Sequence, residues 1–162
     1  MSEFFYLDLY VYATEFGVNS MMIAEEVINL ENGDGTTNTK LATQFRKIPL
    51  KGLRHKHFFC QHFIAKNIQI SLGKNGIDKI IRDVMEESGN SHFESSDISE
   101  IAKRVTNEPL NKRTEGNSLT GEWILFSKHE GKNYYLCLNT HNSGDGNIAT
   151  RIQSHCVNQF PF

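Results

Sequence analysis

Hydrophobic and polar residues alternate with different periods along the chain, and the first such pattern lies close to the N-terminus. Residues 4–13, FFYLDLYVYA, are rich in aromatic and aliphatic side chains. Every second residue from Phe5 to Val11 is apolar, so these side chains would share one face of a strand. The pattern therefore predicts an N-terminal strand.

Apolar residues spaced three and four apart predict helices farther along the chain. A first helix, capped by Asn19 or Ser20, is expected to end near Leu30. The others are expected at residues 53–72, at 77–87, from about residue 96 to Pro109, and over a C-terminal stretch that carries Ile148, Ile152 and Cys156. Residues 107–121 are polar and rich in turn formers, which predicts a long loop.

Two apolar runs near the C-terminus flank a short glycine-containing segment. The runs cover residues 122–129 and 134–141, and this arrangement predicts a β-hairpin. If residues 130–133 form the turn, one face carries four apolar side chains: Trp123, Leu125, Leu136 and Leu138. Glu122 then lies opposite His141 on the other face, beside Lys128. A shift of the turn by one residue would change these pairs.

Together these elements predict an α+β fold. A small antiparallel sheet, made of the N-terminal strand and the C-terminal hairpin, is expected to pack against several helices. The length of 162 residues fits a single domain, residues 1–162. No stretch is apolar enough to span a membrane, and the N-terminus lacks a secretory pattern, so a cytoplasmic protein is expected. The three separated cysteines fit reduced thiols.

Charge changes this picture, because acidic and basic residues are segregated. Residues 1–34 contain seven acids and no Lys or Arg, whereas residues 35–77 contain eight Lys or Arg and no acid. The net charge of −2 hides this asymmetry. The middle segment is therefore expected to contact something anionic, either a polyanion or the acidic N-terminal region of the same protein.

On the expected helix 53–72, basic side chains gather on the outer face, and Phe58 lies among them. Lys and Arg release counterions when they contact phosphates, and an exposed aromatic ring stacks on an unpaired base. RNA is thus a better candidate than DNA. The predicted nucleic-acid-binding residues are Arg46, Lys47, Lys51, Arg54, Lys56, Phe58 and Lys66. The alternative is a solvated helix face, partly neutralised by acids of residues 25–31.

Histidines supply candidate catalysts, because imidazole exchanges protons near neutral pH without a metal. The first choice is His141 as acid or base, with Glu122 orienting it and Lys128 stabilising charge on a phosphate. The second choice is His55 with His62, two turns apart on the expected helix. His57 has helical ligand spacing with Cys60 or Gln61, but two ligands do not make a metal site. No metal and no cofactor are expected.

The leading hypothesis is therefore an RNA-binding domain, with a small metal-independent endoribonuclease of the toxin kind as its catalytic version. The competing hypothesis is a protein-interaction module, such as an antitoxin, immunity or inhibitor protein. In that case the basic segment docks an acidic protein, or the acidic N-terminal third imitates nucleic acid. No membrane partner is expected under either hypothesis.

Overall fold

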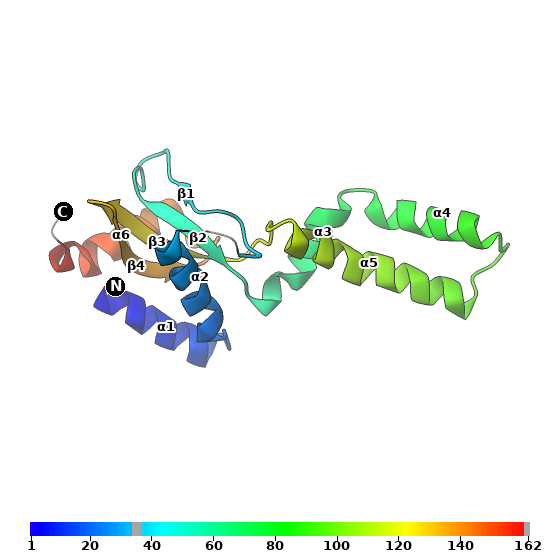
Figure 1. Cartoon of the computed structure of the whole chain (residues 1–162), viewed down its shortest axis with the longest axis horizontal. Coiled ribbons are helices and arrows are strands. Elements are labelled where there is room, and N and C mark those ends of the chain that lie inside the picture. Colours follow the sequence, from blue (N-terminus) through cyan, green and yellow to red (C-terminus); the bar gives the residue numbers. More distant parts are fainter. Residues whose placement is uncertain (34–36, 161–162) are drawn as a thin grey trace.

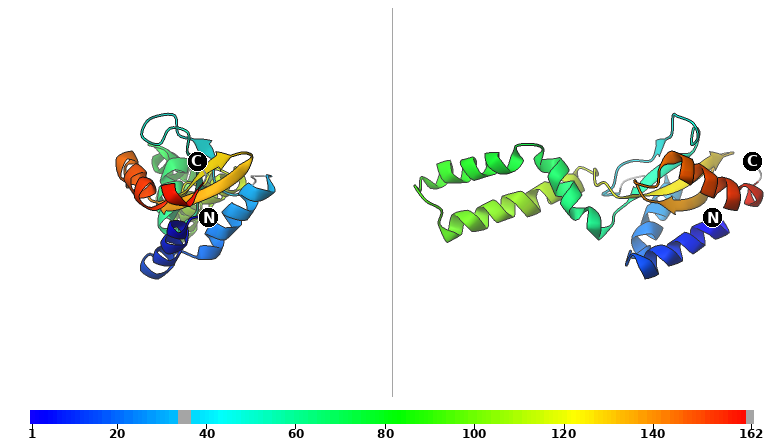
Figure 2. Two further views of the ribbon diagram at one scale, coloured as in Figure 1. Left: turned by 90° about the vertical axis from the view of Figure 1, so that its left-hand side faces the viewer. Right: turned by 180° about the vertical axis from the view of Figure 1, so that it is seen from behind.

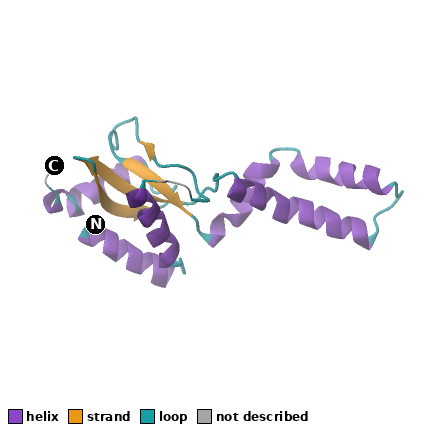
Figure 3. Ribbon diagram, viewed as in Figure 1, coloured by secondary structure: helices purple, strands orange, loops and turns teal. Residues whose placement is uncertain are grey.

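A computed structural model describes residues 1–33 and 37–160. These residues form an elongated molecule in which a body built on one sheet carries a projecting helical arm (Figures 1 and 2). The elements in chain order are α1 (Glu3–Glu15), α2 (Ser20–Asn32), β1 (Thr43–Gln44), β2 (Arg54–Phe58), η1 (Gln61–Phe63), α3 (Ile64–Leu72), α4 (Gly76–Ser88), α5 (Ser95–Glu115), β3 (Glu122–His129), β4 (Lys132–Asn139), α6 (Asp145–His155) and η2 (Val157–Gln159). The predicted α+β class with a small antiparallel sheet is confirmed (Figure 3).

The sheet has the order β1-β2-β3-β4, and all of its strand pairs are antiparallel. The predicted hairpin is confirmed as β3–β4, but its turn contains only Glu130 and Gly131, since His129 pairs with Lys132. Both turn residues have positive φ, 47° and 80°, which matches the twist of a two-residue hairpin. The connection is therefore two residues shorter than the predicted turn.

A register shift between Leu125 and Phe126 decides which side chains share a face of the hairpin. Trp123, Leu125 and Leu136 lie on one face, as predicted. Leu138 lies on the opposite face, so the prediction that it joins them is wrong. The bulge explains the difference, because one extra residue in β4 moves the side chains beyond it to the other face.

The predicted N-terminal strand is wrong: residues 3–15 form α1. The Ser2 hydroxyl caps this helix by accepting a hydrogen bond from the Phe5 amide at 2.9 Å. α1 packs on β4 and buries Phe5, Asp8 and Tyr12, which are spaced as one helical face. Its sequence is apolar on the outer face as well, so alternation alone could not separate helix from strand. The sheet takes β1 and β2 from the middle segment instead.

The predicted helix over residues 53–72 is also wrong in its first half. Residues 54–58 form β2, which pairs with β3 on one side and β1 on the other, and the α-helix begins only at Ile64. Alternation in β2 sends Lys56 and Phe58 to one face and His55 and His57 to the other. The predicted helix placed Phe58 among the basic side chains of the outer face, whereas the strand buries it on the same face as Lys56.

The predicted end of a helix at Pro109 is wrong, because α5 continues through the proline to Glu115. The expected loop over residues 107–121 is therefore mostly helix. Packing against α3 supports α5 here, and its last turn is anchored by Arg113, whose Nε donates to Asn67 Oδ1 at 2.9 Å. Asn67 is fully buried and also joins the strand side, since its Oδ1 accepts from the Thr120 amide at 2.8 Å. The side-chain amide of Asn67 therefore links α3 and α5 to the segment that leads into β3.

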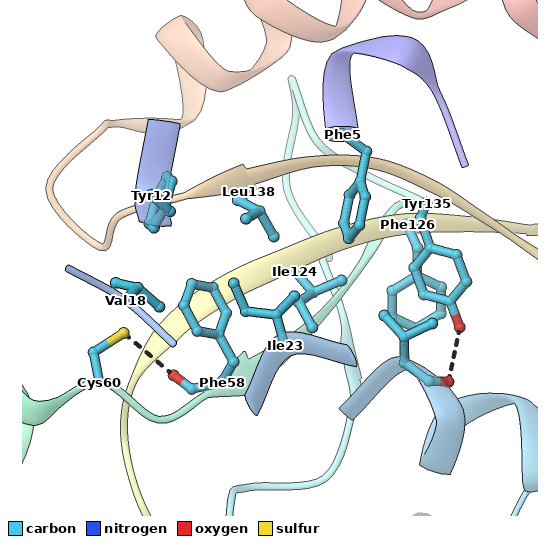
Figure 4. Packing of buried hydrophobic residues seen from close by; sticks show 11 residues of the cluster. Phe5, Tyr12, Val18, Ile23, Phe58, Cys60, Ile124, Phe126, Tyr135 and Leu138 are labelled. Atoms are coloured by element: carbon cyan, nitrogen blue, oxygen red, sulfur yellow. Dashed lines mark hydrogen bonds between the residues drawn. The ribbon is translucent and has the colours of Figure 1, made fainter. Parts of the chain in front are cut away.

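Two hydrophobic clusters hold the sheet between its helices. One cluster lies between the sheet and the helices α1 and α2, where Phe5, Ile23 and Phe58 meet Ile124 from β3 (Figure 4). The other lies on the opposite face, where Ile148 and Cys156 of the C-terminal segment cover the hairpin. All three cysteines are buried free thiols. Both faces of this small sheet are thus covered.

Candidate functional site

Three histidines from distant parts of the chain gather around one tryptophan. His55 and His57 come from β2, Trp123 is the strand partner of His57 in β3, and His141 follows β4. The ring centroids of His57 and His141 are 5.2 Å apart with the rings nearly parallel, at 25°. Trp123 lies 4.9 Å from His55 and 4.4 Å from His141. These four residues are called the histidine cluster below.

Backbone contacts fix the orientation of His57. Its Nδ1 lies 2.9 Å from the Gly121 carbonyl oxygen. The Gly121 amide nitrogen also lies near Nδ1, at 3.3 Å, but the carbonyl contact is shorter and requires a proton on Nδ1. In that tautomer, Nε2 of the neutral ring is left as an acceptor. Residue 121 has to be glycine, because an added Cβ would lie 1.8 Å from the Phe58 carbonyl oxygen. The close approach of two backbones thus brings this carbonyl to the imidazole.

Glu122 holds the segment that carries His141. Its Oε2 accepts a hydrogen bond from the His141 amide at 2.7 Å, and its Oε1 lies 3.4 Å from His62 Nε2. The carboxylate is almost fully buried, at 6% exposure. The predicted proximity of Glu122 and His141 is present, but the carboxylate contacts the backbone of His141 rather than receiving a proton from its ring. Glu122 is therefore a positioning group in this geometry.

Burial keeps the histidine cluster neutral at pH 7. It lowers the pKa of His55 and of His57 to about 4. Burial also lowers the pKa of His141, but the nearby Glu122 carboxylate opposes the shift. Burial therefore lowers the proton affinity of both imidazoles, and at His141 the Glu122 carboxylate works against this shift.

The positive charge beside this cluster belongs to Lys40, which the sequence reasoning missed as a site residue. Its ammonium contributes to lowering the pKa of His55, His57 and His141. Lys40 is exposed, and its amide donates to the Leu119 carbonyl at 3.3 Å. No local motif marks this residue, since it reaches the histidines only through the packing of the segment before β1 against β2.

A basic loop, residues 45–53, lies next to the histidine cluster. Phe45 anchors one end, with ring centroids 4.7 Å from His55 and 5.7 Å from Trp123. Leu50 is fully buried in the cluster beneath the hairpin. The charged side chains of the loop, Arg46, Lys47 and Lys51, are all exposed. Three of the predicted nucleic-acid-binding residues are thus grouped on the surface beside the imidazoles.

Two of the predicted nucleic-acid contacts are wrong, because Lys56 and Phe58 are buried, at 1% and 0% exposure. The Lys56 ammonium lies 3.3 Å from Glu26 Oε2 and donates to Thr39 Oγ1 at 2.9 Å. It also donates to the Lys40 carbonyl at 2.9 Å. The expected contact between the basic segment and the acidic N-terminal region is therefore present inside this molecule. Two other predicted contacts are not buried: Arg54 is partly exposed and Lys66, on α3, is exposed.

The predicted set of Glu122, Lys128 and His141 is not one site. Lys128 pairs with Asn133 near the hairpin turn, whereas Glu122 begins the same strand. Lys128 is six positions after Glu122 along the strand, which separates the two residues by about 20 Å. The second set is corrected as well, since His55 lies in β2 and His62 in η1, not on one helix face. His62 contacts Glu122 at the edge of the histidine cluster.

Other acids of the N-terminal region also have partners within the chain. Asp8 Oδ1 accepts from Arg151 at 2.7 Å, and Glu31 Oε1 accepts from the Tyr135 hydroxyl at 2.5 Å. With Glu26 bound by Lys56, three acids of the described residues 1–33 have partners that stabilise the body. These contacts leave fewer carboxylates for an acidic surface that imitates nucleic acid.

Comparisons of this chain with protein-family models, curated proteins and solved structures find no match. Within residues 1–33 and 37–160, no group of three or more His, Cys, Asp and Glu side chains is arranged to bind a metal ion. None of the helices described is both long enough and apolar enough to cross a membrane. The histidine cluster is therefore interpreted from its chemistry.

Proposed function

We propose that this protein binds RNA and cleaves it at the histidine cluster without a metal. The observation that carries the proposal is the pair His57 and His141, two imidazoles 5.2 Å apart with different surroundings. Lys40 and the basic loop add positive charge beside them. Two imidazoles and a cation are a sufficient set for transesterification of a phosphodiester.

In the proposed reaction, the ribose 2′-hydroxyl attacks phosphorus and loses its proton to His57 Nε2. The bond from phosphorus to the 5′-oxygen breaks, and His141 donates a proton to that oxygen. The products are a 2′,3′-cyclic phosphate and a free 5′-hydroxyl. Burial lowers the pKa of His57 to about 4, so its ring is unprotonated and free to accept the proton. His141 has to carry a proton before it can donate one: burial lowers its pKa, the Glu122 carboxylate opposes that shift, and a bound phosphate would raise the pKa of His141.

Positive charge would supply binding and charge stabilisation. Lys40 would stabilise the developing negative charge on phosphorus. The exposed residues of the basic loop would contact neighbouring phosphates. Each phosphate contact on a single strand makes the logarithm of the affinity fall with the logarithm of salt concentration by about 0.7. The three charges of the loop would thus contribute about 2 to that slope.

The test is cleavage of a fluorophore-quencher RNA in the presence of a chelator, followed by analysis of the product ends. Wild-type protein should leave 2′,3′-cyclic phosphates, and His141→Ala should lower the rate roughly 10²–10⁴-fold. His92→Ala is the matched control, because His92 is exposed in the loop between α4 and α5. Absence of cleavage by folded wild-type protein, or full activity of His141→Ala, would refute the proposal.

The protein-interaction hypothesis keeps one specific observation in its favour. The outer face of α1 exposes Tyr6, Leu7 and Tyr10, at 58%, 54% and 67%. Large apolar side chains grouped on one exposed helix face are typical of a docking surface. A titration of RNA binding against salt concentration separates the two hypotheses. If the protein does not bind RNA even at low salt, a protein partner is favoured.

A further inference from the structure

The arm, formed by α4 and α5, fully buries only a few of its apolar side chains, and others, such as Ile80 and Ile101, are half-buried. Val84 is the only buried residue of α4. Ile77 of α4 and Ile98 of α5 are 49% and 59% exposed. Short helices gain most of their stability from packing of an apolar face, and an isolated pair of helices offers little of it. The arm is therefore a pair of helices with little fully buried apolar surface of its own.

A groove at the base of the arm is one part of this uncovered surface. It lies between α3, α4 and α5, has a volume of about 520 Å³, and is lined mainly by Ile68, Leu72, Ile77 and Val105. This volume lies within the range of sites that accept small apolar groups. At the opposite end, the loop between the helices presents Phe93, which is 52% exposed. One chain therefore carries an apolar groove and an exposed aromatic ring at the two ends of one arm.

The charges of the arm are polarised along the same axis. The tip, residues 83–104, contains six acids and two cations, Lys103 and Arg104, which pair with the tip acids Glu100 and Glu87. The base, residues 64–82 and 105–113, contains six Lys or Arg and two acids. α4 and α5 run side by side (Figures 1 and 2), so the tip is net negative and the base, near the body, is net positive. An arm of this kind is complementary to another copy of itself that points in the opposite direction.

We infer that two copies of this chain associate through antiparallel arms, with Phe93 of each copy seated in the groove of the other. A two-fold axis makes both contacts at once, because the same surface supplies the ring and the groove. The acidic tip then lies against the basic base in both halves of the interface. Ile77 and Ile98 also come close together, since one lies near the base and the other near the tip. This inference does not depend on RNA cleavage.

The first test is the molar mass of the full chain, measured by light scattering and sedimentation over a range of concentrations. A concentration-dependent dimer is expected. Phe93→Ala should weaken it roughly 100-fold, because the contact occurs twice and each loss costs roughly tenfold. Phe16→Ala is the control, since Phe16 is 62% exposed but follows α1, in the body. A monomer at every concentration, or an unchanged dimer with Phe93→Ala, overturns the inference.

A charge-swap experiment tests the antiparallel arrangement. One variant, Glu86→Lys with Ser91→Lys, makes the tip less acidic, and the other, Arg82→Glu with Lys112→Glu, makes the base less basic. All four positions are exposed. Each variant alone should dimerise less than wild type, whereas an equimolar mixture should form a heterodimer, because both of its contacts are again complementary. Failure of the mixture to associate more strongly than either variant alone overturns the arrangement.

Discussion

Replacing Lys56 with methionine should destabilise the protein strongly, although the sequence suggested an exposed phosphate contact. The change removes an ammonium that donates to Thr37 Oγ1 at 2.7 Å and to Thr39 Oγ1 at 2.9 Å. It also leaves the Glu26 carboxylate, 6% exposed, without its cation. Loss of one partner of a buried ion pair typically costs about 3–5 kcal/mol. That is a large share of the roughly 5–15 kcal/mol that stabilises a domain.

The assay is urea unfolding followed by circular dichroism. With a slope of about 2 kcal/mol per molar urea, the midpoint should fall by about 2 M. Lys51→Met is the matched control, because Lys51 is exposed in the basic loop, and a change within about 0.5 kcal/mol is expected. Adding Glu26→Gln to Lys56→Met should recover part of the loss, since no buried charge is then left uncompensated. A Lys56→Met protein as stable as the control would refute this account of the pair.

Three further predictions concern the site. Changing the three exposed basic residues of the basic loop to glutamine should lower RNA affinity and reduce the salt slope by about 2 in a filter-binding titration, with unfolding unchanged. Stability should fall as pH drops from about 6.5 towards 4, because His57 has a pKa of 6.5 in the unfolded chain and of about 4 in the folded protein, so protons bind the unfolded chain more tightly. His57→Gln should remove about 3 kcal/mol of that fall, as measured by urea titrations at several pH values. Gly121→Ala should lose soluble protein or thermal stability, because its Cβ would overlap the Phe58 carbonyl oxygen; an unchanged melting temperature would contradict that geometry.

Local signals in the sequence were sufficient for the hairpin but not for the elements around it. Two apolar runs and a glycine define β3 and β4 almost without help from the rest of the chain. α1 was missed because both of its faces are apolar, and only the Ser2 cap distinguishes it from a strand. Residues 54–58 fit a helical wheel as well as they fit alternation. Pairing with β3, a contact with residues more than 60 positions away, decides for the strand.

The candidate site divides in the same way. Glu122 and His141 were predicted together because they lie near the open end of one hairpin, where pairing is set by a short turn. His57 and Lys40 join them through the packing of β2 on β3 and of the preceding segment, which no spacing in the sequence encodes. Lys56 was expected on the surface as a phosphate contact, whereas the strand buries it. The assignment of a strand instead of a helix therefore changes the role expected of a residue as well as its local structure.

The chain leaves the sheet after β2, forms α3 and the arm, and returns to the sheet at β3. These two strands are neighbours. Phe58 and Glu122, the last and first residues of those strands, are register partners. Partners on adjacent antiparallel strands have Cα atoms only about 5 Å apart. The 63 residues between them therefore form an inserted segment whose first and last residues lie close together. Insertions or deletions in this segment need not disturb the strand register, so the body does not fix the length of the arm. A longer arm would increase the distance between the bodies of two associated copies and leave each histidine cluster intact.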